Sequence, residues 1–197
     1  MSREVHVRFW EGLGVRFPGA TRLLVLFEDE ADAKRFAAML PERLAKFGLE
    51  VAPEKTRLLP FGAKFWRPGR KATGTFDFLG FTHVLGTTRK GKMTVVRLPA
   101  TKGVQRFLRS IKAWLWQNAH TPVQVQQQGL AAKLRGYFQY FGLWNCGPKL
   151  QGIRTQVIWY WIRALRRRGQ RHHITWEWLY RRSWFHLPSP RVVHPMV

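Results

Sequence analysis

The alternation of apolar and polar positions divides the chain into a first half with strand patterns and a second half with helix patterns. An unbroken apolar run over residues 23–27 predicts a strand that is buried on both faces. Asp29 is placed to cap the helix that follows, and Gly48 to end it. The predicted apolar face of this helix consists of Phe36, Met39, Leu40, Leu44 and Phe47. Because Pro41 lies within the pattern, we expect the helix to bend or restart there.

Further β patterns occupy residues 57–59, 76–82 and 93–98, and the last two are typical of a hairpin. Several glycines and a proline interrupt residues 1–22, so we expect no regular element in that stretch. The β patterns end at residues 99–101, which is where we place a domain junction.

Beyond this junction the spacing of apolar residues is helical. The apolar face of the first predicted helix consists of Val104, Phe107, Leu108, Ile111 and Leu115. A second helix is predicted around residues 130–141 and a third around residues 153–165, and a fourth is expected within residues 171–185. The sequence therefore predicts an α+β fold with its helices gathered in the second half.

The charge of the chain is strongly positive, with 34 Lys and Arg residues against 11 Asp and Glu residues, a net charge of +23 and a pI near 11.6. Residues 101–197 hold 16 of the basic residues, eight of the ten tryptophans and a single acid, Glu177. A field of this kind favours a polyanionic partner. Basic residues interleaved with aromatic ones can hold phosphates and stack on unpaired bases, although most aromatic residues belong to a core.

Other sites have weaker signals. Cys146 is the single cysteine, which excludes an internal disulfide and favours a reducing, cytoplasmic setting. The histidines at residues 172, 173, 186 and 194 have no carboxylate or cysteine at ligand spacing, so we expect no zinc site. The acidic cluster at residues 28–32 is interpreted as a helix cap rather than a metal site. No apolar run is long enough to span a membrane, and we expect no membrane partner.

Three segments carry a resemblance to a known family. They are Gly-Leu-Glu-Val-Ala-Pro-Glu-Lys-Thr at residues 48–56, Phe-Asp-Phe-Leu-Gly-Phe at 76–81 and Leu-Arg-Gly-Tyr-Phe-Gln-Tyr-Phe at 134–141. In order, spacing and content this set resembles the group II intron reverse transcriptases, also called maturases. The resemblance covers about residues 23–185.

The resemblance implies a division of the chain into four parts. Residues 1–22 are unmatched to the family, and residues 23–99 resemble the carboxyl-terminal part of a polymerase palm, with strands, one helix and a β-hairpin. Residues 100–185 resemble the all-helical thumb or maturase-specific domain, and residues 186–197 form a tail. The resemblance thus predicts a truncated mobile-element protein that begins within the palm.

One departure from the family bears on activity. In the family, the strand matching residues 23–27 is preceded by Tyr-Ala-Asp-Asp, whose carboxylates hold the Mg²⁺ ions of nucleotidyl transfer. Here the corresponding segment is Gly-Ala-Thr-Arg at residues 19–22. Since an arginine would repel Mg²⁺, we predict no catalytic residues, no cofactor and no polymerase activity for this chain alone.

The preferred function is noncatalytic binding of group II intron RNA or another structured RNA, either to assist splicing or to bind the RNA alone. Three alternatives stay open: the carboxyl-terminal subunit of a split reverse transcriptase whose amino-terminal part is encoded separately, a nonfunctional remnant, and a general basic nucleic-acid-binding protein. The candidate RNA-binding residues are Lys55, Lys102, Arg106, Arg109, Lys112, Lys133, Arg135, Tyr140, Arg163, Arg166, Arg167, Arg168 and Arg171.

Overall fold

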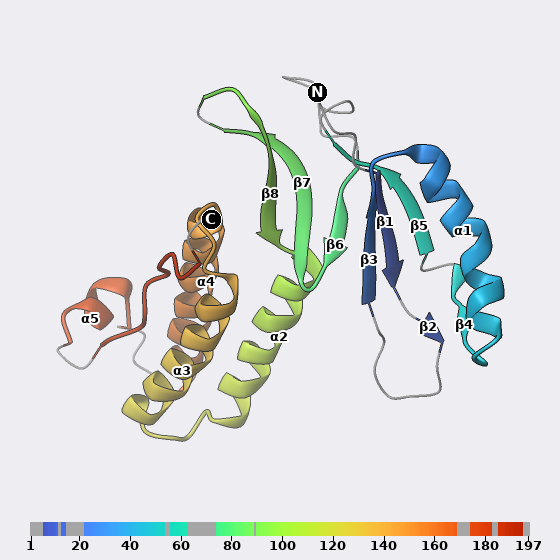
Figure 1. Cartoon of the computed structure of the whole chain (residues 1–197). Helices are drawn as coiled ribbons and strands as arrows, with labels where there is room; N and C mark the ends of the chain where they lie inside the picture. Colours follow the sequence, from blue (N-terminus) through green and yellow to red (C-terminus); the bar gives the residue numbers. More distant parts are fainter. Residues whose placement is uncertain are drawn as a thin grey trace. The chain divides into compact units, whose positions relative to one another are not determined.

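Strands and one helix form the first of two units, Met1–Val96, and helices dominate the second, Arg97–Val197 (Figure 1). The computed structural model describes residues 6–11, 13–14, 22–53, 56–62, 74–88, 90–168, 174–182 and 185–194. Mixed helix and antiparallel sheet make the chain α+β, which confirms the predicted class.

The first unit contains a three-stranded sheet in the order β3-β1-β5. Its strands are β1 (His6–Glu11), β3 (Arg22–Phe27) and β5 (Thr56–Pro60), and both pairs are antiparallel. A separate two-stranded antiparallel sheet consists of β2 (Leu13–Gly14) and β4 (Glu50–Val51). The expectation of no regular element over residues 1–22 is therefore wrong. The glycines and the proline that suggested it all follow β1 in the sequence.

Strand β3 lies at an edge of this sheet, with β1 as its strand partner in the described part of the chain. Its Leu26 side chain is 57% exposed, and Leu24, Val25 and Phe27 are half-buried. The prediction of a strand is confirmed, but the prediction that it is buried on both faces is wrong. A run of apolar residues reports β propensity and does not report which neighbours cover the strand.

Helix α1 (Glu30–Ala45) follows as predicted, with the Asp29 carboxylate accepting a hydrogen bond of 3.0 Å from the Ala31 amide. It ends at Ala45, three residues before the predicted Gly48, whose φ of +67° suits a residue without a side chain. The helix continues through Pro41 and does not restart there. Of the predicted apolar face, Phe36 packs against Phe27 of β3 with ring centroids 5.2 Å apart. Two predicted members of that face are instead exposed, Met39 and Phe47.

The predicted hairpin is a three-stranded meander of β6 (Phe76–Phe78), β7 (Phe81–Thr87) and β8 (Met93–Pro99). A two-residue turn joins β6 to β7, with φ of +46° at Leu79 and +78° at Gly80, as in the type I′ turns that favour hairpins. Phe76, Phe61 and Leu85 form a small buried cluster of the first unit.

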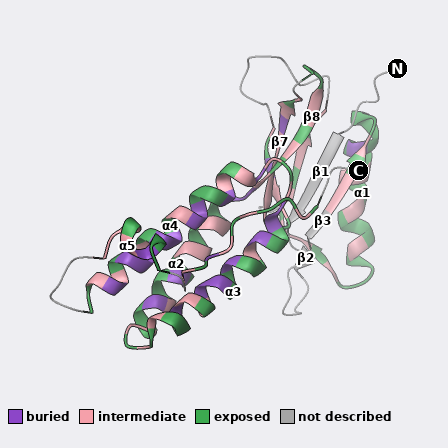
Figure 2. Ribbon diagram, turned by 90° about the vertical axis from the view of Figure 1, so that its left-hand side faces the viewer, coloured by how far each residue is buried: buried purple, intermediate pink, exposed green. Residues whose placement is uncertain are grey.

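The helical unit consists of α2 (Thr101–Gln117), α3 (Val123–Phe141), α4 (Gly147–Arg166) and the short α5 (Trp176–Tyr180). Buried residues gather along the facing sides of α2, α3 and α4 (Figure 2). The three predicted long helices are confirmed, and their core contains the predicted residues Ile111, Leu115, Leu130, Leu134, Ile153, Val157, Ile158, Trp161 and Leu165. The fourth helix is shorter than its predicted window.

The segment 185–194 packs on the helical unit instead of forming a free tail. Leu187 is 3% exposed, and the Val193 amide donates a 2.8 Å hydrogen bond to the Gly142 carbonyl. The side chain of Arg154 donates to the carbonyls of Leu187 and Pro188 at 3.2 and 3.1 Å. These contacts join the segment to α4 and to Gly142 after α3.

Candidate nucleic-acid interface

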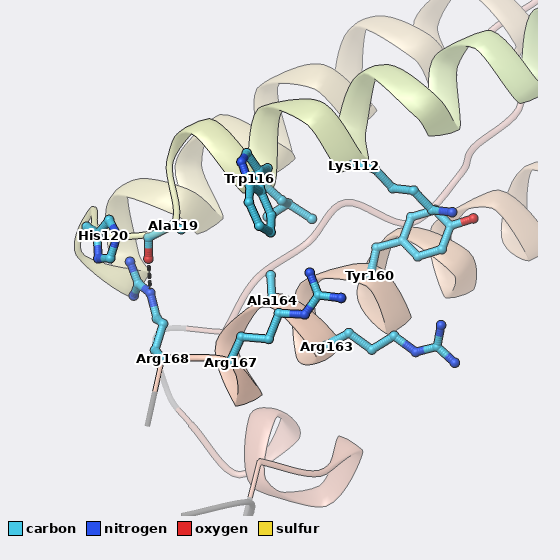
Figure 3. Close-up of a pocket in the computed structure, with 10 residues that line it drawn as sticks. Lys112, Trp116, Ala119, His120, Tyr160, Arg163, Ala164, Arg167 and Arg168 are labelled. Carbon is cyan, nitrogen blue, oxygen red and sulfur yellow. Dashed lines mark hydrogen bonds between the residues drawn. The ribbon is translucent and has the colours of Figure 1, made fainter. Parts of the chain in front are cut away.

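A groove of about 610 Å³ opens between α2 and α4 of the helical unit (Figure 3). It forms where the two helices diverge from their shared core, in which Ile111 and Leu115 of α2 and Val157 and Trp161 of α4 are buried. The groove is lined by Lys112, Leu115, Trp116, Ala119, His120, Tyr160, Arg163, Ala164, Arg167 and Arg168.

The helical periods of α2 and α4 explain the composition of the groove. Positions that point into the core are apolar, and the positions beside them at the rim are basic or aromatic. Leu115 and the small side chains of Ala119 and Ala164 form the floor, which leaves room above them. No lining residue in this described region is acidic, so the rim is a concave surface of uniform positive charge.

Two cation–aromatic contacts organise the rim. The Lys112 ammonium lies 4.4 Å from the centroid of the Tyr160 ring, and the Arg167 guanidinium lies 5.8 Å from Trp116. Trp116 is 72% exposed, which is unusual for the largest apolar side chain. Its indole reaches from α2 toward Ala164 of α4 (Figure 3). The groove therefore presents a flat aromatic surface next to free positive charge.

Arg168 has a structural role at one end of the groove. Its guanidinium donates hydrogen bonds to the carbonyls of Ala119 and Thr121, just beyond the end of α2 (Figure 3). These carbonyls follow the last turn of the helix, where acceptors lack intrahelical donors. Desolvation at this position lowers the pKa of Arg168 from its usual value. Arg166 acts similarly, since its Nε donates a 2.8 Å hydrogen bond to the carbonyl of Ile174. Both side chains are partly committed to the fold.

A second hollow of about 180 Å³ continues the surface along α2, lined by Gln105, Leu108, Arg109, Lys112 and Tyr160. Lys112 and Tyr160 belong to both hollows, so the structure brings Arg109 close to the groove. Lys102 and Arg106 are exposed on the same helix and line neither hollow. At helical spacing, Lys102, Arg109 and Lys112 share one side of α2.

The candidates on α3 lie outside the groove. The Lys133 ammonium is 5.5 Å from the ring of Trp114, and Arg135 is exposed. Tyr140 is 52% exposed, with its ring 4.8 Å from that of Phe141. Two further candidates, Lys55 and Arg171, fall outside the described residues.

Sequence reasoning missed Trp116, Tyr160 and His120 of the groove. A signal for Trp116 was present, because it lies four residues after Lys112 and outside the apolar face of α2. A tryptophan on the basic face of an amphipathic helix is a better candidate for binding than one on the apolar face. Tyr160 precedes the buried Trp161 and likewise falls on the polar side of its helix.

The residues that the structure describes also bear on metal and membrane binding. No group of three or more His, Cys, Asp or Glu residues in these ranges is placed to hold a metal ion. The acidic residues at the start of α1 include the cap Asp29, and Glu30 forms a 2.8 Å ion pair with Lys34. None of the described helices combines the length and apolar character needed to cross a membrane.

The chain was compared with models of protein families, with curated proteins and with solved structures, and none of the three comparisons found a match. The fold and the groove define the class of protein as an α+β chain whose helical unit carries a basic, aromatic groove.

Proposed function

We propose that the chain binds structured RNA without catalysing a reaction on it, as a cytoplasmic relative of the group II intron maturases. The observation that carries the proposal is the groove between α2 and α4, where exposed Trp116 lies beside Lys112, Arg163 and Arg167. The Lys and Arg side chains of this rim can bind phosphates, and the exposed indole can stack on a base. The motif resemblance supplies the kind of RNA, a group II intron.

Under this proposal the two units correspond to the end of a polymerase palm and to a thumb. The antiparallel strands and α1 would then belong to the palm, and the three long helices to the thumb. The proposal involves no Mg²⁺, because Arg22, the first residue of β3, stands where the family has a metal-binding carboxylate. The helical unit would then be the RNA-binding part.

The experiment measures binding of the full chain to a folded group II intron RNA and to duplex DNA of equal length across a salt series. We expect tighter binding to the RNA, with a preference that persists at moderate salt. Equal affinities that fall together with salt would reduce the chain to a general basic nucleic-acid-binding protein.

A matched pair of double variants localises the binding. Arg163→Ala with Arg167→Ala removes two charges from the groove, and Arg43→Ala with Arg57→Ala removes two exposed charges from the first unit. We expect the groove variant to lose RNA affinity and to lower the slope of log K against log salt by about 1 to 2. The variant of the first unit should bind like the wild type. Equal losses of RNA affinity in the two double variants would show that the groove is not the specific RNA-binding site.

A second candidate function is the carboxyl-terminal subunit of a split reverse transcriptase. The observation that favours it is the edge position of β3, where Leu26 is 57% exposed and a further strand from another chain can pair. Co-purification of the chain with a separately encoded reverse-transcriptase amino-terminal part would support it. Recovery of the chain without such a part, from cells that express both, would exclude it.

A further inference from the structure

The exposure of Trp116 calls for an explanation beyond charge. An indole that is 72% exposed leaves most of its apolar surface in water, which is unfavourable. A patch made only to attract phosphates would need no tryptophan, because lysines and arginines suffice. Trp116 lies opposite the small side chain of Ala164 of α4 (Figure 3), and Ala119 is the other small residue that lines the groove.

The geometry of the rim fits a flat ring joined to phosphates. Arg167 lies 5.8 Å from the Trp116 ring, and Lys112 lies on the same helix, four residues before Trp116. Arg163 and Arg167 are one turn apart on α4. A ring stacked on the indole would therefore have cations from both helices within reach of its flanking groups. The volume of about 610 Å³ lies within the range of about 300 to 1,000 Å³ that is usual for pockets that hold small molecules.

The same geometry favours an unpaired base over a base in a duplex. In a duplex both faces of every internal base are covered by its neighbours, so that an indole in a groove cannot reach them. An unpaired nucleotide in a bulge or loop exposes a face for stacking and remains flanked by phosphates. An acidic peptide would meet the charge of the rim but would offer no ring joined to two anionic groups.

We propose that the groove between α2 and α4 accepts one unpaired nucleotide of an RNA, with its base stacked on Trp116 and its flanking phosphates held by Lys112, Arg163 and Arg167. This inference rests on the proposed function and adds the part of the RNA that is recognised. Base stacking on an aromatic side chain tolerates any sequence, so the groove selects an unpaired base and not a particular one.

The test uses the full chain and two RNA hairpins with equal numbers of phosphates, one fully paired and one with a single bulged 2-aminopurine. Wild-type protein should bind the bulged hairpin about tenfold more tightly and should change the fluorescence of the bulged base. Trp116→Ala should lose this gain, so that it binds the two hairpins about equally. Trp116→Phe should retain part of the gain, since a smaller ring still stacks.

The matched control is Trp144→Ala, which removes an indole that is 41% exposed in the same unit but outside the groove. It should keep the full preference for the bulged hairpin. The inference is overturned if wild-type protein binds both hairpins equally, or if Trp116→Ala keeps the preference. If the bulge preference depends on Trp116 but the salt series shows no selectivity for RNA over DNA, the stacking site stands and the RNA-binding function is rejected.

Discussion

The indole Nε1 of Trp161 donates a 2.9 Å hydrogen bond to the side-chain oxygen of Gln126, and both residues are almost fully buried. The side-chain Nε2 of Gln126 in turn donates a 2.5 Å hydrogen bond to the backbone carbonyl of Asn118. This chain of hydrogen bonds joins α3 and α4 to the segment after α2. A buried polar group is stable only when its partners are present, so Gln126 fixes how the three helices meet.

Replacing Gln126 with Leu should therefore destabilise the helical unit, although leucine is the more apolar residue. The change removes the Gln126 acceptor from the buried Trp161 indole, whereas the Asn118 carbonyl keeps the hydrogen bonds from Thr121. We expect a cost of about 1 to 3 kcal/mol in the free energy of unfolding. Urea unfolding followed by tryptophan fluorescence measures the change. Gln124→Leu, at an exposed position of the same helix, is the control and should have little effect. Equal stability of the two variants would contradict the structural role of Gln126.

Two glycines of α3 should respond in opposite directions to the same substitution. A Cβ added at Gly129 would lie 2.5 Å from the Trp114 ring, whereas one added at Gly136 would have no atom within 4 Å. Gly129→Ala should cost about 1 to 3 kcal/mol, because a rigid ring must move. Gly136→Ala should stabilise the helix by about 0.5 to 1 kcal/mol, because alanine is the better helix former. Thermal unfolding of both variants checks the difference in sign, and a stabilising Gly129→Ala would contradict the close packing of α2 on α3.

The sequence predicted the long helices well for a physical reason. In α4 the apolar residues Ile153, Val157 and Trp161 recur at four-residue spacing in a local, continuous element, and all three are buried. The strands were predicted less well, since their environment depends on pairing between distant segments. Leu26 has the residue type of a buried strand but lies exposed in an edge strand.

The sequence predicted individual residues of the candidate site but not the groove that they share. Lys112 and Arg163 were both candidates, as members of separate basic patches on two helices. Their shared groove depends on the packing of α2 against α4, which no local pattern encodes. Conversely, Arg166 and Arg168 were indistinguishable in sequence from Arg167, although they donate hydrogen bonds to backbone carbonyls.

The stability of the helical unit should fall at alkaline pH because of Tyr137. Its ring packs between Phe107 and Phe141, at centroid distances of 4.1 and 4.5 Å. Burial raises the pKa of Tyr137 from 10.0 to about 12, and the nearby Cys146 adds to this shift. The folded state thus favours the neutral phenol. The stabilisation is complete below pH 10 and is lost as the pH rises toward 12, because the unfolded chain then ionises more readily.

Tyr137→Phe should remove this part of the pH dependence. The Tyr137 hydroxyl has no hydrogen-bond partner within the described structure, so the substitution leaves no group unpaired. The measurement is the free energy of unfolding of both proteins below pH 10 and close to pH 12. In Tyr137→Phe, an ultraviolet titration should also lose the tyrosine whose pKa is raised to about 12. Parallel pH profiles for the two proteins would show that Tyr137 titrates normally.

Arg154 should control the attachment of the segment 185–194. It is 9% exposed on α4, and its guanidinium donates to the carbonyls of Leu187 and Pro188 and, at 3.3 Å, to the Tyr180 hydroxyl. Because a planar guanidinium holds three acceptors in fixed directions, a lysine cannot replace it. Both Arg154→Ala and Arg154→Lys should therefore loosen the segment, with a loss of about 2 to 3 kcal/mol for the alanine variant.

Hydrogen exchange resolved by segment distinguishes this local effect from general instability. In the Arg154 variants, amides of the segment 185–194 should exchange faster than those in the middle of α4, whose buried apolar contacts are unchanged. The control is Arg191→Ala, which removes an exposed arginine from the segment itself and should leave its protection intact. If the segment stays as protected in Arg154→Ala as in the control, then apolar contacts such as that of the buried Leu187 hold it, and the guanidinium does not.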